Sequence, residues 1–293
     1  MTMLPLGVTG VMLPELDLGE QLALCAELGV THYVIRPRVT PERAAGQPYH
    51  SHGNHKFDLT PGRFADEGEA IGEQIRTAGL TPFCTVPAEN ADAPDEQHEQ
   101  NFRGAAAAGF SRVKVTPINY PKELFDYPAY LDKAVARYRA LCDLAKPYNL
   151  KLIIEMHAGN SASAPGLARL ILQQFDPGEL GVIIDLPNYA REGFVAPVLG
   201  LSALAPWIDH VHLGGLRRVK GERDGLGFVQ TGGEMCALVD SDLHVPTWLR
   251  QLHGLGREVP LIIEDYEQGM TGEAKLRRAV EQVAPVLEGL HGA

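Results

Sequence analysis

Short apolar runs that end in an acid or a histidine recur along the sequence and constrain its fold most strongly. Each run is bounded by residues typical of turns, and stretches with helical spacing of apolar residues separate the runs. A short apolar run of this kind is typical of a buried parallel strand, so its last residue lies where the strand leaves the core. Four such strands are expected at 151–155, 180–185, 207–212 and 259–264, and they end in Glu155, Asp185, His212 and Glu264.

The rest of the chain continues the same alternation of strand and helix. Four further strands are expected at 4–12, 31–36, 80–86 and 112–116. Helical spacing and end signals predict helices at 18–28, 61–78, 95–108, 127–148, 165–175, 194–204, 247–255 and 272–290.

Eight strands that alternate with eight helices, without a linker between them, indicate a parallel sheet. At 293 residues they predict an α/β chain folded as a closed (β/α)₈ TIM barrel, with a single domain over 1–293. The alternative is an open doubly wound sheet. No GxGxxG follows the first strand, whereas chemically active residues follow many strands, and both observations favour the barrel.

Composition excludes several classes of partner and location. The formal net charge of -11 opposes nucleic acid, because binding to a phosphate backbone depends on lysine and arginine. No run approaches the roughly 20 apolar residues of a membrane span, and the first residues lack the basic and apolar regions of a signal peptide. The four cysteines form no CxxC pair. We therefore expect a cytoplasmic protein without a membrane partner, and a homodimer only from the general frequency of dimers.

Four strand-end side chains converge at one end of such a barrel. Three carboxylates packed together repel one another unless a cation neutralises them, so Glu155, Asp185, His212 and Glu264 predict a divalent metal site. Oxygen-rich ligation with one imidazole suits Mn²⁺, which we expect, as well as Mg²⁺ or Co²⁺, and Zn²⁺ also fits. Taken singly, the aspartate is equally consistent with a helix cap and the histidine with a core residue.

The motifs around these residues also carry a resemblance. They read Ile-Ile-Glu155-Met-His, Val-Ile-Ile-Asp185, His210-Val-His212-Leu-Gly and Ile-Ile-Glu264. The set resembles the xylose-isomerase-like TIM-barrel superfamily of sugar isomerases and epimerases, and the ketose 3-epimerase branch in particular. The resemblance implies one divalent metal on the four residues, usually manganese, with Glu155 and Glu264 as the acid/base pair. It implies proton transfer next to a carbonyl of a sugar, through an enediolate that the metal stabilises.

Four more residues are candidate substrate ligands. By resemblance, Arg218 is the arginine that reaches the substrate, with Arg217 as the alternative; both could also be solvated loop charges. His157 and His210 lie two residues from expected ligands on the same strand faces, although His210 is equally consistent with the core. Asn188 stands where the epimerases have a histidine, and asparagine binds a hydroxyl but exchanges no proton near neutral pH.

That departure leaves other reactions open. The alternatives are a related isomerase, a metal-dependent lyase or a dehydratase acting on a sugar or inosose derivative. An apurinic-site endonuclease needs histidines at the ends of the second and third strands, where this chain has Arg36 and Val86. A barrel that binds a sugar or a partner subunit without catalysis is a further alternative.

Two long segments lie between the expected elements, and the sequence does not assign them a function. Residues 38–59 carry His50, His52 and His55 and follow the second strand, so they could close over a substrate or serve no function. Residues 213–246 are too long for a plain connection.

Overall fold

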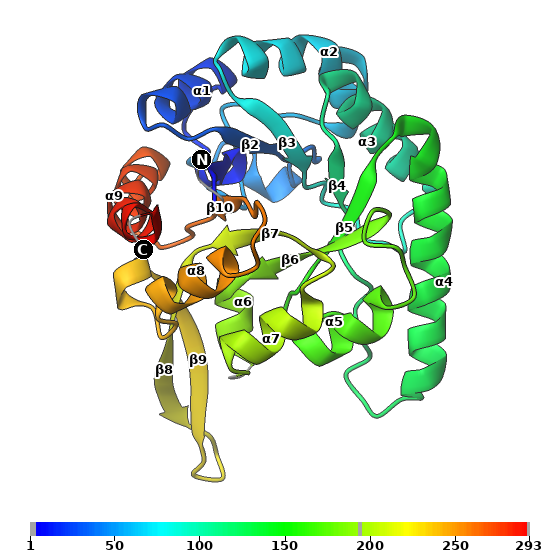
Figure 1. Ribbon diagram of the computed structural model, residues 1–293, viewed down its shortest axis with the longest axis vertical. Coiled ribbons are helices and arrows are strands. Elements are labelled where there is room, and N and C mark those ends of the chain that lie inside the picture. Colours follow the sequence, from blue (N-terminus) through cyan, green and yellow to red (C-terminus); the bar gives the residue numbers. More distant parts are fainter. Residues whose placement is uncertain (1–3, 193–194, 292–293) are drawn as a thin grey trace.

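The apolar runs form a closed parallel barrel in the computed structural model, which describes residues 4–192 and 195–291. Around the barrel the strand order is β1-β10-β7-β6-β5-β4-β3-β2, and the helices surround it (Figure 1). The prediction of a (β/α)₈ TIM barrel is confirmed. The barrel strands are β1 (Leu6–Thr9), β2 (His32–Ile35), β3 (Thr81–Thr85), β4 (Arg112–Lys114), β5 (Lys151–Glu155), β6 (Leu180–Asp185), β7 (Ile208–Leu213) and β10 (Leu261–Ile263).

The helices lie outside the barrel, and some of them, including α1 and α2, begin at a side-chain cap. At α1 the side chain of Asp17 accepts from the Glu20 backbone at 3.0 Å, while Glu20 accepts from the Asp17 backbone at 2.8 Å. Thr60 caps α2, whose first residue is a proline. The helices are α1 (Leu18–Glu27), α2 (Pro61–Thr77), α3 (Asp95–Ala108), α4 (Tyr127–Ala145), α5 (Pro165–Leu172), α6 (Leu186–Glu192), α7 (Pro197–Leu204), α8 (Val245–His253) and α9 (Gly272–His291).

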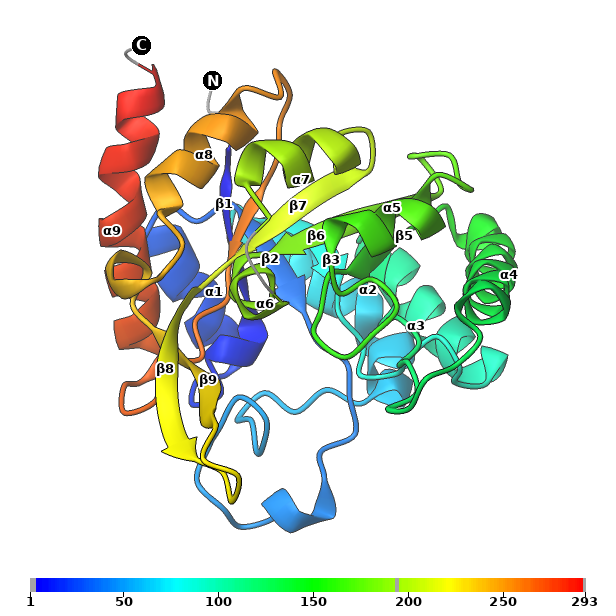
Figure 2. The ribbon, with the colours of Figure 1, turned by 90° about the horizontal axis from the view of Figure 1, so that it is seen from below.

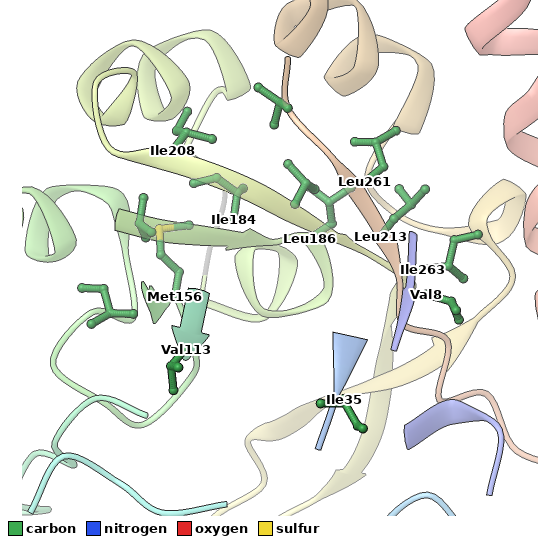
Figure 3. Close-up of a cluster of buried hydrophobic side chains, with 14 of the residues drawn as sticks. Val8, Ile35, Val113, Met156, Ile184, Leu186, Ile208, Leu213, Leu261 and Ile263 are labelled. Atoms are coloured by element: carbon green, nitrogen blue, oxygen red, sulfur yellow. The ribbon is translucent and has the colours of Figure 1, made fainter. Parts of the chain in front are cut away.

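The strands send alternate side chains outward to the helices and inward to the barrel. The outward set forms the main core with the helices and is almost fully buried. Inward positions on the same strands are often charged, because Lys114, Asp185 and His212 alternate with apolar neighbours. The outward set includes Val8, Val113, Ile184, Ile208, Leu213, Leu261 and Ile263 (Figure 3).

A charged cluster fills the barrel interior near the strand starts. The Asp209 carboxylate accepts from Arg112 Nε at 2.9 Å and from Lys151 Nζ at 2.9 Å. A register shift in the pairing of β6 and β7 lets Asp209 join this cluster while His210 still points inward. Gly181 makes room for the lysine, because a Cβ there would lie 2.8 Å from Lys151 Cε. The cluster closes the barrel at the end away from the strand-end acids.

Replacing Asp209 by alanine is expected to lower the free energy of unfolding by about 2 kcal/mol, because two cations lose their acceptor. The side chain of Asp209 is only 2% exposed, whereas Arg112 and Lys151 keep some contact with water. Urea denaturation measures the change. The control is Asp143→Ala, which removes an ion pair from the surface and should cost less than about 1 kcal/mol. Equal effects of the two substitutions would contradict a structural role for the cluster.

Several expected elements differ from those observed. The long segment 213–246 contains an antiparallel hairpin, β8 (Gly215–Arg223) and β9 (Val229–Cys236). The helix α6, directly after β6, was not expected, and the helix expected at 194–204 is α7, with Phe194 outside the described residues. The first strand is shorter than expected because a 3₁₀ turn, Gly10–Met12, follows β1. Among the described helices, none is both long and apolar enough to span a membrane.

The hairpin and the segment 38–59 lie on the same side of the barrel (Figure 2). Both follow strand ends, β7 in one case and β2 in the other. These two insertions therefore flank the mouth at which the strand-end acids emerge.

Candidate metal centre

Four neighbouring strands deliver the expected acids and histidine to one place. Glu155 and Asp185 end β5 and β6, His212 lies near the end of β7, and Glu264 follows β10 directly. Because β5, β6, β7 and β10 are consecutive around the barrel, one ligand atom from each residue lies within 4.8 Å of all the others. The structure thus brings together the whole set that the sequence singled out.

The imidazole of His212 lies at the centre of the three carboxylates. Its Nδ1 is 2.7 Å from Glu264 Oε2, 3.2 Å from Glu155 Oε1 and 3.5 Å from Asp185 Oδ2. Burial alone would lower the pKa of His212, but the three carboxylates outweigh burial and hold this pKa well above its ordinary value. In the metal-free protein the ring is therefore a cation that partly neutralises the acids.

The carboxylates differ in how strongly they hold a proton. Burial raises the pKa of Glu155, but Lys114 and His212 outweigh burial and keep this pKa well below its usual range. Burial also raises the pKa of Glu264, and His212 brings it below its ordinary value. Burial, and to a smaller extent the negative charge of Glu155, raises the pKa of Asp185, and the contact with His212 does not fully offset this rise. Both glutamates are thus ionised at neutral pH and available as bases.

A lysine that was not among the predicted site residues completes the charge balance. Lys114 ends β4, is mostly buried, and donates from Nζ to Glu155 Oε2 at 2.7 Å. Arg112 and Lys114 alternate with Val113 and Val115 in the sequence, and this period of two was the available signal for inward-pointing charges. Lys114 holds Glu155 in place and ionised.

Replacing Lys114 by methionine is expected to lower the free energy of unfolding of the metal-free protein by about 2 kcal/mol at pH 7. The physical reason is that the buried carboxylate of Glu155 loses its cation. Because Lys114 depresses the pKa of Glu155, its stabilisation is fully present above the unfolded pKa and is lost as pH falls through the folded pKa, so the difference should begin to shrink below about pH 4 and disappear only at lower pH, below the folded pKa.

Chemical denaturation at several pH values measures this difference. The control is Lys220→Met on the exposed hairpin, which should change stability by less than about 0.5 kcal/mol at every pH. A Lys114→Met penalty that stays constant down to low pH would show that packing of the lysine, and not its charge, stabilises the site.

The other glutamate has a tyrosine partner. The hydroxyl of Tyr266 donates to Glu264 Oε1 at 2.7 Å. The ring of His52, from the segment 38–59, packs against Tyr266 with ring centroids 5.0 Å apart. Of the three loop histidines, His52 lines the main pocket, whereas His50 lines a second cavity and His55 bonds the Ser51 backbone. The segment after β2 therefore covers one side of the site.

A glycine next to β7 allows the fourth residue of the cluster to come close. A Cβ on Gly214 would lie 2.6 Å from the backbone oxygen of Glu264. Glycine at this position is the residue that permits β10 to bring Glu264 against the end of β7. The glycine in the motif His210-Val-His212-Leu-Gly thus has a local steric reason.

A polar pocket of about 330 Å³ opens above the four residues. Among its lining residues are His157 and Asn188, both expected near a substrate. The Asn188 side-chain oxygen accepts from the Ala158 backbone at 3.3 Å, and its backbone donates to Asp185 Oδ1 at 2.6 Å. The pocket is lined by Arg36, His52, Lys114, Glu155, His157, Asp185, Pro187, Asn188, Arg191, Met235, Glu264, Tyr266 and Gln268.

Two expected substrate residues lie elsewhere. His210 is fully buried beneath the site, its ring 5.3 Å from that of His212, and its Nδ1 contacts Asp209 at 2.9 Å. Burial lowers the pKa of His210 to about 4, so its ring is neutral at pH 7. Arg218 donates to the Ala190 backbone oxygen at 3.0 Å and borders a neighbouring cavity of about 240 Å³. Neither side chain lines the main pocket.

The donor set suits a divalent cation. Three carboxylates and one imidazole nitrogen converge, and buried acids of like charge need such a counter-ion. Oxygen ligands with a single imidazole are found around Mn²⁺, Mg²⁺, Co²⁺ and Zn²⁺. The buried cluster could hold a metal, and its chemistry leaves the identity of that metal open.

Comparison with known proteins shows which family the chain matches. A sequence profile of the family described as xylose isomerase-like TIM barrel matches residues 22–286. No curated protein sequence matches the chain.

Solved structures with the same architecture include the IOLI protein with a bound zinc atom, at 16% identity and a TM-score of 0.74, covering 98% of this chain and 99% of that one. The probable 3-DHS dehydratase AsbF from Bacillus anthracis is similar at 13% identity and a TM-score of 0.71, covering 96% and 99%. An L-ribulose 3-epimerase is similar at 13% identity and a TM-score of 0.70, covering 98% and 96%. At these identities the likeness shows a shared fold.

Proposed function

The chain belongs to the xylose isomerase-like TIM barrel family, and we propose that it is a divalent-metal-dependent isomerase or epimerase of a sugar or sugar-like hydroxy-ketone. The observation that carries the proposal is the pair of ionised glutamates at a four-residue centre under a polar pocket. A pocket of this volume is at the small end of ligand sites, which supports a small-molecule substrate. The likeness to an L-ribulose 3-epimerase agrees with this class of reaction.

Glu155, Asp185, His212 and Glu264 would hold one divalent ion, with manganese as our first choice. When bound, the ion supplies a Lewis acid that polarises a substrate carbonyl and so acidifies the neighbouring C–H bond. The protein contributes the position of the four side chains, since each emerges from a rigid strand of the barrel.

We assign the proton transfers to Glu155 and Glu264. A general base must be unprotonated, and the pKa of each of these carboxyls lies below its ordinary value. Lys114 holds Oε2 of Glu155, and the Tyr266 hydroxyl holds Oε1 of Glu264, so both carboxylates keep a fixed orientation. β5 and β10 lie on either side of β6 and β7. This arrangement supports removal of a proton by one glutamate and return of a proton by the other.

Asn188 and His157 have supporting roles in this proposal. The side-chain oxygen of Asn188 is taken by the Ala158 backbone, which leaves the amide nitrogen to donate to a substrate hydroxyl. Since an amide exchanges no proton near neutral pH, proton transfer rests on the two glutamates. His157 is exposed at the mouth, where it can contact the outer part of a substrate.

A lyase or dehydratase is the second candidate, and Asn188 is the observation that favours it. In such a reaction one glutamate would remove the proton next to the carbonyl, and the hydroxyl would leave from the neighbouring carbon as water with a proton from the other glutamate, while the asparagine only orients that hydroxyl. The likeness to a probable 3-DHS dehydratase agrees with this alternative. An endonuclease is disfavoured by Arg36 and Val86 at the ends of the second and third strands and by the acidic net charge.

Solvent isotope exchange tests the proposal. The manganese-loaded protein is incubated in deuterated water with a panel of ketoses and sugar derivatives, and the products are analysed by mass spectrometry and NMR. We expect deuterium at the carbon next to the carbonyl of at least one sugar. An unsaturated or shortened product would identify a lyase instead, and no deuterium in any member of the panel would refute the isomerase.

A further inference from the structure

Arg36 is a pocket residue to which the proposed chemistry gives no role. It follows β2 directly, is partly buried and lines the main pocket. Within the described residues its guanidinium has no hydrogen bond and no ion pair. A guanidinium presents five donors and is always charged, so an arginine in a pocket without an acceptor is prepared for a ligand that brings one.

Three other cations near the mouth are already engaged. Lys114 donates to Glu155. Arg38, two residues after Arg36, donates to the Gly53 backbone oxygen, and Arg218 donates to that of Ala190. Arg191, which also lines the pocket, is exposed, so Arg36 is the partly buried arginine of the pocket.

The charge balance of the pocket points the same way. Glu155, Asp185 and Glu264 carry three negative charges, which a divalent ion and Lys114 together neutralise. Arg36 and Arg191 then remain as two positive charges, and no further carboxylate lines the pocket in the part of the chain that the structure describes. In a protein with a net charge of -11 this local excess of positive charge is a property of the pocket, not of the surface.

The position of Arg36 separates it from the acids. The acids occupy the ends of β5, β6 and β10, whereas β2 lies beyond β1 on the other side of the mouth. Tyr266 and His52 line the pocket with Arg36. A substrate that places its carbonyl over the acids can therefore extend its other end toward Arg36.

We propose that Arg36 binds an oxyanion group of the substrate, a carboxylate or a phosphate, at the end remote from the reacting carbon. The inference rests on the proposed function, because it takes the acidic half of the mouth as the reacting end. Guanidinium groups bind carboxylate and phosphate through paired hydrogen bonds, and both anions share this chemistry. The substrate class is thus an acidic or phosphorylated hydroxy-ketone.

The test uses three ketoses that differ only at the sixth carbon, which are D-fructose, D-fructuronate and D-fructose 6-phosphate. Their dissociation constants are measured by calorimetry on the manganese-loaded protein. We expect at least one anion to bind about tenfold or more tightly than D-fructose, and Arg36→Gln to remove this advantage. The anion that gains affinity identifies carboxylate or phosphate as the natural group.

Two further variants keep the test interpretable. Arg103→Gln removes an exposed arginine from α3, outside the pocket, and should leave all three affinities unchanged. Arg36→Lys keeps the charge without the paired donors and should give an intermediate affinity for the anion. Manganese affinity, measured for every variant, shows that the centre remains intact.

Equal affinities for the three ketoses, or an anion affinity that Arg36→Gln leaves unchanged, would overturn the inference. The same samples in deuterated water separate it from the proposed function. Exchange into a ketose, together with an anion affinity that does not depend on Arg36, would uphold the isomerase and refute the anion site. Anion binding that depends on Arg36, with no exchange into any ketose, would uphold the anion site and refute the isomerase.

Discussion

Asp185→Asn is expected to weaken manganese binding more than about 100-fold. Loss of a group that only supports a metal ligand typically costs 10- to 100-fold in affinity, and loss of the charged ligand itself should cost more. The substitution preserves shape, so the backbone N–H of Asn188 still finds an oxygen to bond. Calorimetric titration with Mn²⁺ and the rise in melting temperature on adding the metal both measure the effect.

The matched control is Asp240→Asn, which neutralises an exposed aspartate outside the four-residue cluster. This variant should bind manganese as tightly as the unchanged protein. An Asp185→Asn variant that binds manganese within about threefold of the unchanged protein would contradict the assignment of Asp185 as a ligand.

Glu264→Gln is expected to slow solvent exchange into the substrate by about 10²- to 10⁴-fold at saturating manganese, the range typical of a lost general base. Glu264 is a cleaner target than Glu155, because replacing Glu155 would also leave Lys114 without its carboxylate. Glutamine still offers an oxygen to the Tyr266 hydroxyl, so the local structure should persist. Rates measured after confirming metal occupancy separate proton transfer from metal binding.

Glu234→Gln on the exposed strand β9 is the control, since it removes a carboxylate that pairs only with Arg217 in the described structure. It should exchange at the unchanged rate. A metal-loaded Glu264→Gln variant that retains more than about a tenth of the activity would assign the base elsewhere.

The barrel itself was predictable because its signals are local. The limits predicted for β5 and β6 match the observed strands, since each is a short apolar run that ends at an acid. Consecutive parallel strands end on the same rim, so the meeting of Glu155, Asp185, His212 and Glu264 followed from topology alone. Local periodicity and a single topological rule therefore account for the four-residue cluster.

The insertions were harder to predict. The hairpin β8–β9 is exposed on both faces for most of its length, so the alternation of apolar and polar residues that marks a half-buried strand is missing. Its glycines also lower its strand propensity. The helix α6 begins immediately after β6, with a proline at its second residue, and no element was predicted there. Arg218 could not be placed because its position depends on this unrecognised hairpin.

Contacts between distant segments were also missed. Lys114 donates a hydrogen bond to Glu155, and Tyr266 donates one to Glu264. The order of residues along the chain does not reveal such side-chain pairs. Tyr266 lies only two residues beyond Glu264, so the spacing offered a signal that both side chains face the mouth. The same spacing puts His210 on the same strand face as His212, one step deeper in the barrel. The sequence does not show how deep the barrel is at this point, and so it does not show that His210 is buried.

The central claim is that the four strand-end residues form one divalent metal site. Anomalous diffraction at the manganese absorption edge, from crystals of the manganese-loaded protein, tests it most directly. We expect a single strong peak in contact with Glu155, Asp185, His212 and Glu264. A manganese-loaded crystal whose anomalous peaks all lie away from these residues would contradict the account.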